Sequence, residues 1–333
     1  MARVDRSVNT LERPIRVGVS SCLLGQPVRW DGGHKRNAFL VRQLDRFVEW
    51  VPVCPELESG MGVPRPTLRL ARDGDGLRLL EACSGRDHTH AMQRFARRRV
   101  RELAKQGLCG YVLKRGSPSC GMERVAVYGK KGTPVRSGRG LFAERLLERL
   151  PLLPVEEEGR LEDPATRENF VERVFAYRRL RDRFVGRWSR RAAIEFHAAH
   201  ELQIMAHCPQ SYARMGRLLA RVASLAPCDF RERYGAAFMG ALQRRATPGR
   251  HANALQHMAG HLRDHLDAAS RRELADLIRG YRAKRLPRVA PLALLRHHAR
   301  HFQVEYLLGQ AYLDPHPAEL MHRSASPSGS GRP

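Results

Sequence analysis

Three cysteines follow short apolar segments of the sequence, each near the point where a strand is predicted to end. IRVGVSSC ends at Cys22, VEWVPVC at Cys54 and YVLKRGSPSC at Cys120, and Gly or Pro follows each cysteine within a few residues. In an open parallel sheet, residues that follow different strands meet at the carboxyl edge. The pattern predicts that these thiols converge on one site, although a lone cysteine is more often a small core residue.

Thiolates are ligands of zinc and of iron-sulfur clusters. The gaps of 32 and 66 residues between the cysteines match no compact Cys-x-x-Cys motif, so spacing alone leaves the metal open. Three thiols would leave one iron of a four-iron cluster without a protein ligand, and an open metal position is typical of a catalytic centre. Nearby Glu56, Ser117 and Ser119 could activate water or pass a proton, and ordinary turn residues are the alternative interpretation.

The remaining cysteines and the histidines give weaker signals. We predict burial for the four cysteines that lack a strand-end setting, which are Cys83, Cys109, Cys208 and Cys228. Two sets of histidines lie at helical spacing: His197, His200, His207, His257, His261 and His265. Histidines on amphipathic helices are more often packed or exposed residues than zinc ligands, so we do not assign them to a metal site.

The composition describes a water-soluble protein with a large positive charge. The chain has 333 residues, a mean hydropathy of -0.47, a net charge of +25 and a pI near 11.0. Lys and Arg exceed Asp and Glu in both halves, which favours a polyanionic partner such as nucleic acid; an arginine-rich surface without a partner is the alternative. The sequence has no membrane-length apolar run and no secretory signal, so we expect a cytoplasmic protein that does not bind membranes.

The predicted secondary structure changes near residue 155. Before it, apolar segments at 15–22, 48–54, 68–82, 111–114 and 125–136 predict strands, and segments 88–107 and 138–150 predict helices. This alternation indicates an α/β domain with a mainly parallel sheet. After the acidic junction EEEGRLED, which we expect to be exposed, the pattern predicts an all-α domain with helices at about 166–184, 189–206, 210–225, 250–266, 270–282 and 291–311.

The predicted organisation therefore has four parts. A basic arm covers residues 1–14, the α/β domain covers 15–156, the helical domain covers 164–320, and a disordered tail covers 321–333. A chain of this length suits two domains of ordinary size.

Several segments of the first domain together resemble the thiouracil desulfurase family, formerly the domain of unknown function DUF523. They are SSCLLGQPVRWDGGHKRN, VCPELESGMGVPRP, SGRDHT and LKRGSPSCG, and they span most of residues 15–155. The second half, with RENFVERVFAY, HANALQHMAG and YLDPHP, is similar to the helical DUF1722 domain that accompanies this family in a two-domain subset. The arrangement resembles that of bacterial tRNA 4-thiouridine desulfidases.

The resemblance implies an iron-sulfur enzyme. It assigns a [4Fe-4S] cluster with one open iron to Cys22, Cys54 and Cys120, and catalytic roles to Glu56 and Ser117. In such an enzyme the open iron takes up the sulfur of a thiocarbonyl, water activated by the glutamate attacks C4 of the base, and hydrosulfide leaves without net redox change. Further candidates for binding the substrate are Ser119, Arg65 and Lys114.

The charge favours tRNA over free thiouracil, because the free base carries no phosphates. Basic residues in three regions are candidate tRNA contacts: Lys35, Arg36, Arg97, Arg98, Arg173, Arg214, Arg217 and Arg250. A solvated helix face is the alternative interpretation of the arginine run at 97–101. Free thiouracil as the substrate, or a noncatalytic RNA- or DNA-binding protein with a structural zinc, are the alternative functions. The sequence predicts no oligomeric state.

Overall fold

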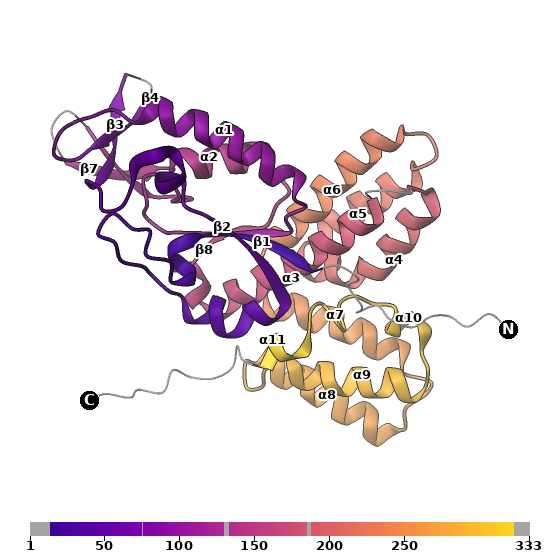
Figure 1. The fold of residues 1–333 in the computed structure, drawn as a ribbon. Helices are drawn as coiled ribbons and strands as arrows, with labels where there is room; N and C mark the ends of the chain where they lie inside the picture. The colour runs from indigo at the N-terminus through magenta and orange to yellow at the C-terminus, as the bar shows by residue number, and fades with distance from the viewer. Residues whose placement is uncertain (1–13, 75, 130–132, 185–187, 323–333) are drawn as a thin grey trace, which may run out of the picture. The chain divides into compact units, whose positions relative to one another are not determined.

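The structure is a computed structural model that describes residues 14–74, 76–129, 133–184 and 188–322. The chain divides into two compact units, residues 1–162 and 163–333 (Figure 1). Almost all of the predicted arm at 1–14 and tail at 321–333 lies outside the described residues. Among the helices of the described part of the chain, none is long and apolar enough to cross a membrane.

The central sheet of the first unit is entirely parallel, as the sequence predicts. Its strands are β1 (Ile15–Ser20), β2 (Val48–Val53), β5 (Gly110–Leu113) and β8 (Val155–Glu157), in the order β2-β1-β5-β8. The strands that precede the three cysteines are therefore direct neighbours. Gly18 in β1 is required by this packing, because an added Cβ would lie 2.1 Å from the ring of Tyr111 on β5.

The segments predicted as strands at 68–82 and 125–136 each form a hairpin, and the two hairpins form a second sheet. Strands β3 (Leu68–Asp73) and β4 (Gly76–Glu81) pair antiparallel, as do β6 (Val125–Tyr128) and β7 (Pro134–Gly138). Parallel pairing of β3 with β6 joins the hairpins in the order β4-β3-β6-β7. The first unit thus contains a mixed sheet beside the parallel one.

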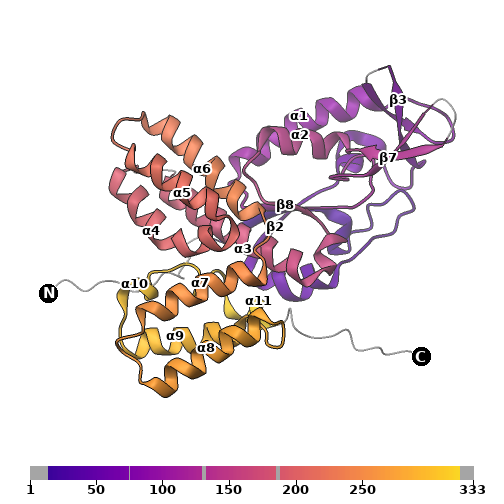
Figure 2. The same cartoon turned by 180° about the vertical axis from the view of Figure 1, so that it is seen from behind.

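Two helices of the first unit pack side by side. They are α1 (Thr89–Lys105) and α2 (Leu141–Arg149), and Figure 2 shows them from behind. The ring of Phe142 on α2 lies 6.3 Å from that of Phe95 and 6.0 Å from that of Tyr111, measured between centroids. Helix α1, predicted at 88–107, buries an apolar stripe that consists of Met92, Phe95, Val100 and Leu103.

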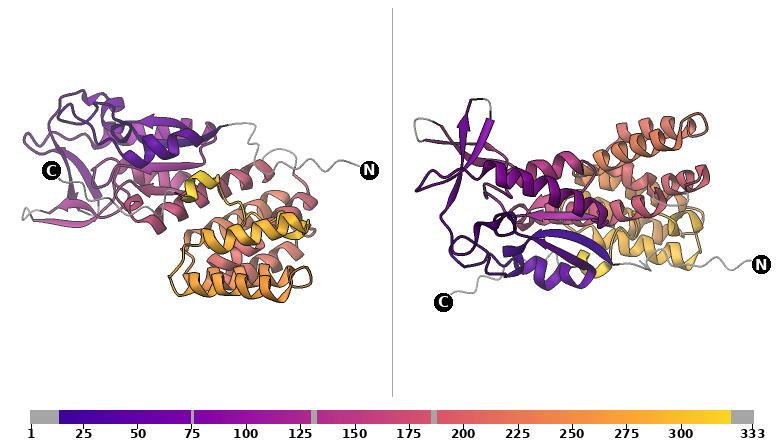
Figure 3. Two further views of the ribbon diagram at one scale, coloured as in Figure 1. Left: turned by 90° about the horizontal axis from the view of Figure 1, so that it is seen from below. Right: turned by 45° about the horizontal axis from the view of Figure 1, so that its top comes forward.

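The second unit is helical. Its helices are α3 (Pro164–Phe184), α4 (Arg190–His207), α5 (Pro209–Ala220), α6 (Pro227–Gln243), α7 (Pro248–His261), α8 (Ala268–Arg282), α9 (Val289–His301), α10 (Glu305–Leu308) and α11 (Ala318–His322). The N-cap side chains of Ser189, Thr247 and Asp267 accept backbone hydrogen bonds at the starts of α4, α7 and α8. Helices α7, α8 and α9, coloured orange to yellow, lie side by side in Figures 1 and 3.

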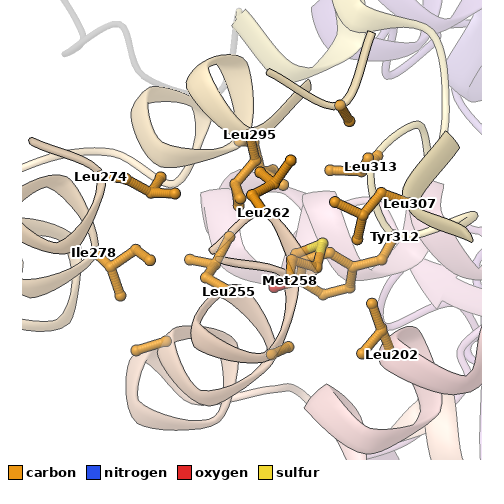
Figure 4. Close-up of a cluster of buried hydrophobic side chains, with 14 of the residues drawn as sticks. Leu202, Leu255, Met258, Leu262, Leu274, Ile278, Leu295, Leu307, Tyr312 and Leu313 are labelled. Carbon is orange, nitrogen blue, oxygen red and sulfur yellow. The ribbon is translucent and has the colours of Figure 1, made fainter. Parts of the chain in front are cut away.

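A cluster of buried aliphatic side chains holds these three helices together. Figure 4 shows Leu255 and Met258 of α7 and, beside Leu295 of α9, Leu262, the residue after α7. The other labelled members of the cluster are Leu274 and Ile278 of α8, Leu202, Leu307, Tyr312 and Leu313. Each of the ten labelled side chains is buried. Removing apolar surface from water is the main stabilising contribution in such a unit.

Three expectations about local structure are wrong. Helix α6 was not predicted, and the single helix expected at 291–311 ends at His301 and resumes only over α10. The acidic junction is not exposed throughout: Glu156 and Glu157 belong to β8 and are 5% and 3% exposed. They are buried because β8 pairs with β5, a tertiary contact that residue type does not reveal.

The prediction that the other four cysteines are buried is correct for two of them. Cys109 and Cys208 are buried, whereas Cys83 and Cys228 are exposed. Cys83 lies in the turn after β4, and Cys228 lies in the first turn of α6, so both occupy the ends of elements rather than their packed faces.

Candidate active site

A cavity of about 330 Å³ lies at the carboxyl edge of the parallel sheet. Its walls include Cys22, Cys54 and Cys120, together with the candidate catalytic residues Glu56 and Ser117. The structure therefore brings together residues that the sequence separates by up to 98 positions. We call this space the cysteine cavity.

The first two cysteines leave their strands almost at once. Cys22 lies in a short 3₁₀ turn after β1, and its carbonyl accepts a hydrogen bond from the backbone of Lys35 at 2.9 Å. Cys54 is the first residue after β2, and its backbone N–H donates to the Glu58 carboxylate at 2.9 Å. Backbone contacts thus fix the position of both thiols.

The turn that carries Cys120 is held from two sides. The Ser117 hydroxyl oxygen accepts hydrogen bonds from the backbone N–H groups of Ser119 at 3.2 Å and Cys120 at 3.1 Å. The start of α2 closes over the same turn, because the N–H of Phe142 donates to the Ser119 carbonyl at 3.0 Å. Gly140 makes this approach possible, since an added Cβ would lie 2.4 Å from the Ser119 carbonyl group.

The Glu56 carboxylate is bound through both of its oxygens. Its Oε1 accepts hydrogen bonds from the hydroxyls of Ser119 at 2.7 Å and Ser117 at 3.4 Å. Its Oε2 accepts from Arg65, through Nε at 3.0 Å and Nη2 at 2.6 Å. Ser119 is 1% exposed and Ser117 is only half-buried, so Ser117 is the serine with more access to the cavity.

Arg65 and Lys114 line the cavity, but protein groups already engage both side chains. Arg65 is 8% exposed and also donates to the carbonyls of Gly62 and Val28, at 2.9 and 3.0 Å. Lys114 Nζ pairs with Glu158 Oε1 at 2.5 Å. Arg65 therefore holds Glu56 in place, a role that the sequence does not indicate because nothing in it pairs these two residues.

Trp30 is a cavity residue that the sequence analysis missed. Its side chain is 45% exposed and forms part of the cavity wall, next to Arg29 and Lys35. Exposure of a large aromatic side chain at a cavity is typical of a surface on which a flat ligand stacks. Its place in the segment between Cys22 and Lys35, which carries the family resemblance, is a signal that could have singled it out.

The electrostatics of the cavity disfavour three isolated thiolates. Burial raises the pKa of the Cys22 thiol to about 11, and the nearby Cys54 adds to this rise. Burial also raises the pKa of Cys54, and it raises that of Cys120, which is further affected by Glu56 and the other two thiols. The thiols are thus close enough to influence one another, and their joint ionisation calls for a cationic group among them.

Three soft thiol ligands around one cavity fit an iron-sulfur cluster. Within the described residues, no group of three or more His, Cys, Asp and Glu side chains is arranged to hold a metal ion. In a cluster each cysteine binds a different iron, so a cluster does not require the three sulfurs to lie within reach of one ion.

The candidate tRNA contacts occupy different settings. Lys35 is exposed at the cysteine cavity, and Arg36 follows it in the same loop. The exposed set also includes Arg97, Arg98, Arg214 and Arg217. Arg250 donates to the carbonyl of His207 at 3.1 Å. Arg173 is 7% exposed within α3, and its contact with phosphate stays a prediction.

Three of the six histidines that the sequence places at helical spacing are packed, and three are exposed. His197, His200 and His207 are buried, and His257 is exposed. His261 and His265 are also exposed, and each lies near an aromatic ring: the His261 ring is 4.2 Å from that of Tyr306 in a tilted pair, and the His265 ring is 5.4 Å from that of Phe302 in a stacked pair, measured between centroids.

Comparison with known proteins agrees with this site. The family model described as 2-thiouracil desulfurase matches residues 17–158, and one described as a protein of unknown function (DUF1722) matches residues 201–317. The chain is 30% identical over 153 residues to the uncharacterized protein YbgA of Escherichia coli (strain K12), covering 45% of this chain and 90% of YbgA. It is 32% identical over 108 residues to the uncharacterized protein YbbK of Bacillus subtilis (strain 168), covering 31% of this chain and 71% of YbbK.

Among solved structures, the chain is similar to the "[4Fe-4S]-dependent thiouracil desulfidase TudS". The two are 33% identical, with 44% of this chain and 93% of the other covered and a TM-score of 0.36. The family match covers the strands, the cysteines and the carboxylate that build the cysteine cavity. The chain belongs to the 2-thiouracil desulfurase family, in a two-domain form in which a DUF1722 domain follows the desulfurase domain.

Proposed function

We propose that this protein is an iron-sulfur desulfidase that converts 4-thiouridine in tRNA to uridine and releases hydrosulfide. The observation that carries the proposal is the meeting of three thiols, a carboxylate and a serine hydroxyl around one cavity. Family membership supports desulfidase chemistry. Family membership does not specify tRNA as the substrate, and that assignment is part of our proposal.

Cys22, Cys54 and Cys120 are the residues that would hold a [4Fe-4S] cluster in the cysteine cavity. When bound, the cluster supplies a Lewis acid for the sulfur of the substrate, through the iron that no cysteine occupies. The three ligands come from neighbouring strands, so the sheet determines where the cluster lies relative to Glu56.

Glu56 is the group that activates water in this proposal. Arg65 binds its Oε2, which keeps the carboxylate oriented and leaves Oε1 toward the serines. A water molecule that attacks C4 of the base would lose a proton to this carboxylate. Ser117 lies between the carboxylate and the Cys120 turn and can pass a proton toward the departing sulfur, while the buried Ser119 keeps Glu56 in position.

Charge supports a polynucleotide as the substrate. The net charge of +25 is spread over both halves of the chain, and free thiouracil offers no phosphates to account for it. Lys35 lines the cysteine cavity itself, so its ammonium group is available to the RNA backbone on either side of a thiolated base.

The test uses anaerobically prepared, cluster-reconstituted protein. It is incubated with tRNA that carries 4-thiouridine and, separately, with 4-thiouracil; nucleosides and released sulfide are then quantified. We expect uridine and sulfide in equal amounts from the tRNA, and a slower reaction with the free base. A protein that acts on 4-thiouracil and leaves the tRNA unchanged would contradict the tRNA assignment, and a protein inactive toward both would contradict the desulfidase proposal.

A further inference from the structure

The last residue of β1 is a buried serine at the cysteine cavity. Ser20 is 2% exposed and lines the cavity together with Cys120. Its hydroxyl oxygen accepts a hydrogen bond at 3.0 Å from the backbone N–H of Lys114, the residue after β5. This contact connects β1 with the segment that leads to Cys120, and it fixes where the Ser20 hydroxyl lies.

The Ser20 hydroxyl also contacts the sulfur of Cys120. A serine hydroxyl can accept hydrogen bonds and donate one. The Lys114 N–H occupies an acceptor position of Ser20, so the hydroxyl proton remains available for a second partner. Burial raises the pKa of the Cys120 thiol, and a hydrogen bond from the Ser20 side chain opposes this rise. That direction is expected when the hydroxyl donates to the sulfur and favours the thiolate.

The hydroxyl of Ser119 has a different partner. It lies 3.8 Å from the Cys120 sulfur but only 2.7 Å from Glu56 Oε1. A hydroxyl has a single proton, and a carboxylate oxygen is a stronger acceptor than a sulfur atom. The proton of Ser119 therefore belongs to Glu56. Among the residues that the structure describes, this leaves Ser20 as the hydroxyl that donates to Cys120.

Cys54 receives its hydrogen bonds from the backbone. Burial raises the pKa of the Cys54 thiol, whereas hydrogen bonds from the backbone of Leu57 and Glu56 lower it. Substitution of a side chain leaves such backbone donors in place. Donation to Cys120, in contrast, depends on the side chain of Ser20, so a single substitution can remove it.

We propose that Ser20 is a positioning residue that donates a hydrogen bond to the iron-bound sulfur of Cys120 and so draws electron density away from this ligand. Hydrogen bonds to cysteine sulfurs are among the factors that set the reduction potential of an iron-sulfur cluster. A donor to a ligand thiolate stabilises negative charge, so it raises the potential and strengthens the Lewis acid on which desulfidation depends. The inference rests on the proposed function and deepens it, because it adds a residue that adjusts the cluster to the three that hold it.

The first test is the midpoint potential of the cluster in reconstituted, substrate-free protein. An anaerobic redox titration, followed by electron paramagnetic resonance, compares the wild type with Ser20→Ala. We expect a more negative potential in the variant because its reduced cluster lacks a donor. The equilibrium constant for one-electron reduction should fall about tenfold, the effect of about one hydrogen bond, which corresponds to about 59 mV.

A conservative variant and a control separate this effect from packing. Ser20→Thr retains a hydroxyl and should restore the wild-type potential. The control is Ser59→Ala, which removes a hydroxyl that donates to the Glu56 carbonyl at 3.0 Å and does not line the cysteine cavity. An unchanged potential in Ser20→Ala, a shift that Ser20→Thr does not reverse, or an equal shift in the control would overturn the proposal.

Iron and sulfide analysis covers the case in which Ser20→Ala does not retain the cluster. Loss in this variant with wild-type content in Ser20→Thr would support the need for the hydroxyl. Loss in both variants would mean that the site requires the size of serine, and it would overturn the proposal.

Neither measurement uses a substrate, so the two proposals can fail separately. A shifted potential in a protein that desulfurates no substrate would refute the proposed function alone. An active enzyme whose potential does not change in Ser20→Ala would refute the role of Ser20 alone. Wild-type protein that assembles no cluster would overturn both.

Discussion

Both units of this protein hold a glutamate among polar partners, Glu56 in the first and Glu172 in the second, and the two sites differ in what lies beside the carboxylate. In the first unit, Glu56 is held by Arg65 and Ser119 at the wall of the cysteine cavity. In the helical unit, Glu172 is 2% exposed and lies against Gln203 at 2.7 Å and His207 at 3.4 Å, both on α4. The Glu56 carboxylate borders a cavity that a substrate could enter, whereas the Glu172 carboxylate contacts side chains of a neighbouring helix.

The ionisation of Glu172 fits a structural role. Burial alone would raise its pKa, but His207, Arg288 and the hydrogen bond from Gln203 keep the pKa well below the ordinary value. A charge stabilised in this way links α3 to α4. We infer that a buried carboxylate indicates catalysis only where one of its oxygens borders a cavity, and the following changes test this distinction.

The largest effect should come from removing a thiol of the cysteine cavity. Cys120→Ala takes away one proposed cluster ligand, so we expect loss of bound iron and sulfide and no measurable desulfidation. Iron and sulfide analysis of anaerobically prepared protein measures this. The control is Cys83→Ala, which removes an exposed thiol outside the cavity and should retain full iron and activity. Wild-type iron content in the Cys120 variant would contradict the ligand assignment.

The two glutamates should then respond in opposite ways. Glu56→Gln should lower kcat about 10²- to 10⁴-fold, the usual contribution of a general base, and should keep the cluster. Glu172→Gln should leave turnover per folded molecule unchanged and lower the free energy of unfolding by about 3 kcal/mol or more, since it leaves buried partners without their charge. Steady-state kinetics and urea unfolding measure the two quantities. A large kinetic effect of the Glu172 substitution would break the comparison between the units.

An intermediate effect should follow from moving the Cys120 turn. Gly140→Ala places a methyl group against the Ser119 carbonyl, so we expect the turn to shift and kcat to fall by up to about 10²-fold, as small misplacements of catalytic groups do. The control is Gly129→Ala, whose added Cβ meets nothing within 4 Å. Unchanged kinetics in the Gly140 variant would mean that the turn tolerates movement.

A smaller effect should come from the wall of the cysteine cavity. Trp30→Ala removes an exposed ring on which a pyrimidine could stack, and we expect KM for the thiolated base to rise about tenfold with little change in kcat. Trp30→Phe should restore most of the affinity. An equal loss in both variants would indicate that the ring packs rather than stacks.

The smallest effect should be the acid sensitivity of the helical unit. Burial, with the nearby charge of Arg179, lowers the pKa of His200 to about 3. Below about pH 6.5 the unfolded chain takes up a proton that the folded unit does not, so this residue lowers stability by about 1.4 kcal/mol per pH unit as pH falls. His200→Phe should flatten the slope measured by urea unfolding between pH 7 and 5, and substitution of the exposed His257 should not.

The part of the site that depends on strand ends was predictable from sequence. Apolar segments that stop at a cysteine are local patterns, and the rule that parallel strands share a carboxyl edge converts them into a spatial prediction. The role of Arg65 was not predictable, because its pairing with Glu56 depends on how the loop after β2 folds back. Trp30 lies in the segment after β1 that carries the family resemblance, but its exposure at the cavity depends on how that segment folds.

Two elements of the fold were also not predicted, because their burial depends on tertiary contacts. Strand β8 was missed because its acidic residues are buried only through tertiary partners, such as the pairing with β5 and the ion pair between Glu156 and Arg160. Helix α6 was missed because it packs against α3, α4 and α5 and so lacks a single apolar stripe. Local periodicity identifies elements with one buried face more easily than elements that are covered on several sides.

The strand order has a geometric consequence for the cysteines. Strands β2, β1 and β5 are neighbours in the sheet, so thiols placed directly at their ends would lie along a line. Three irons of the proposed [4Fe-4S] cluster would instead require their three cysteine ligands to form a triangle. Cys22 and Cys54 follow their strands within two residues, and Cys120 comes seven residues after β5. The longer segment between β5 and Cys120 lets the Cys120 sulfur lie off that line. We therefore expect a change in the number of its residues to impair the site more than a substitution within it.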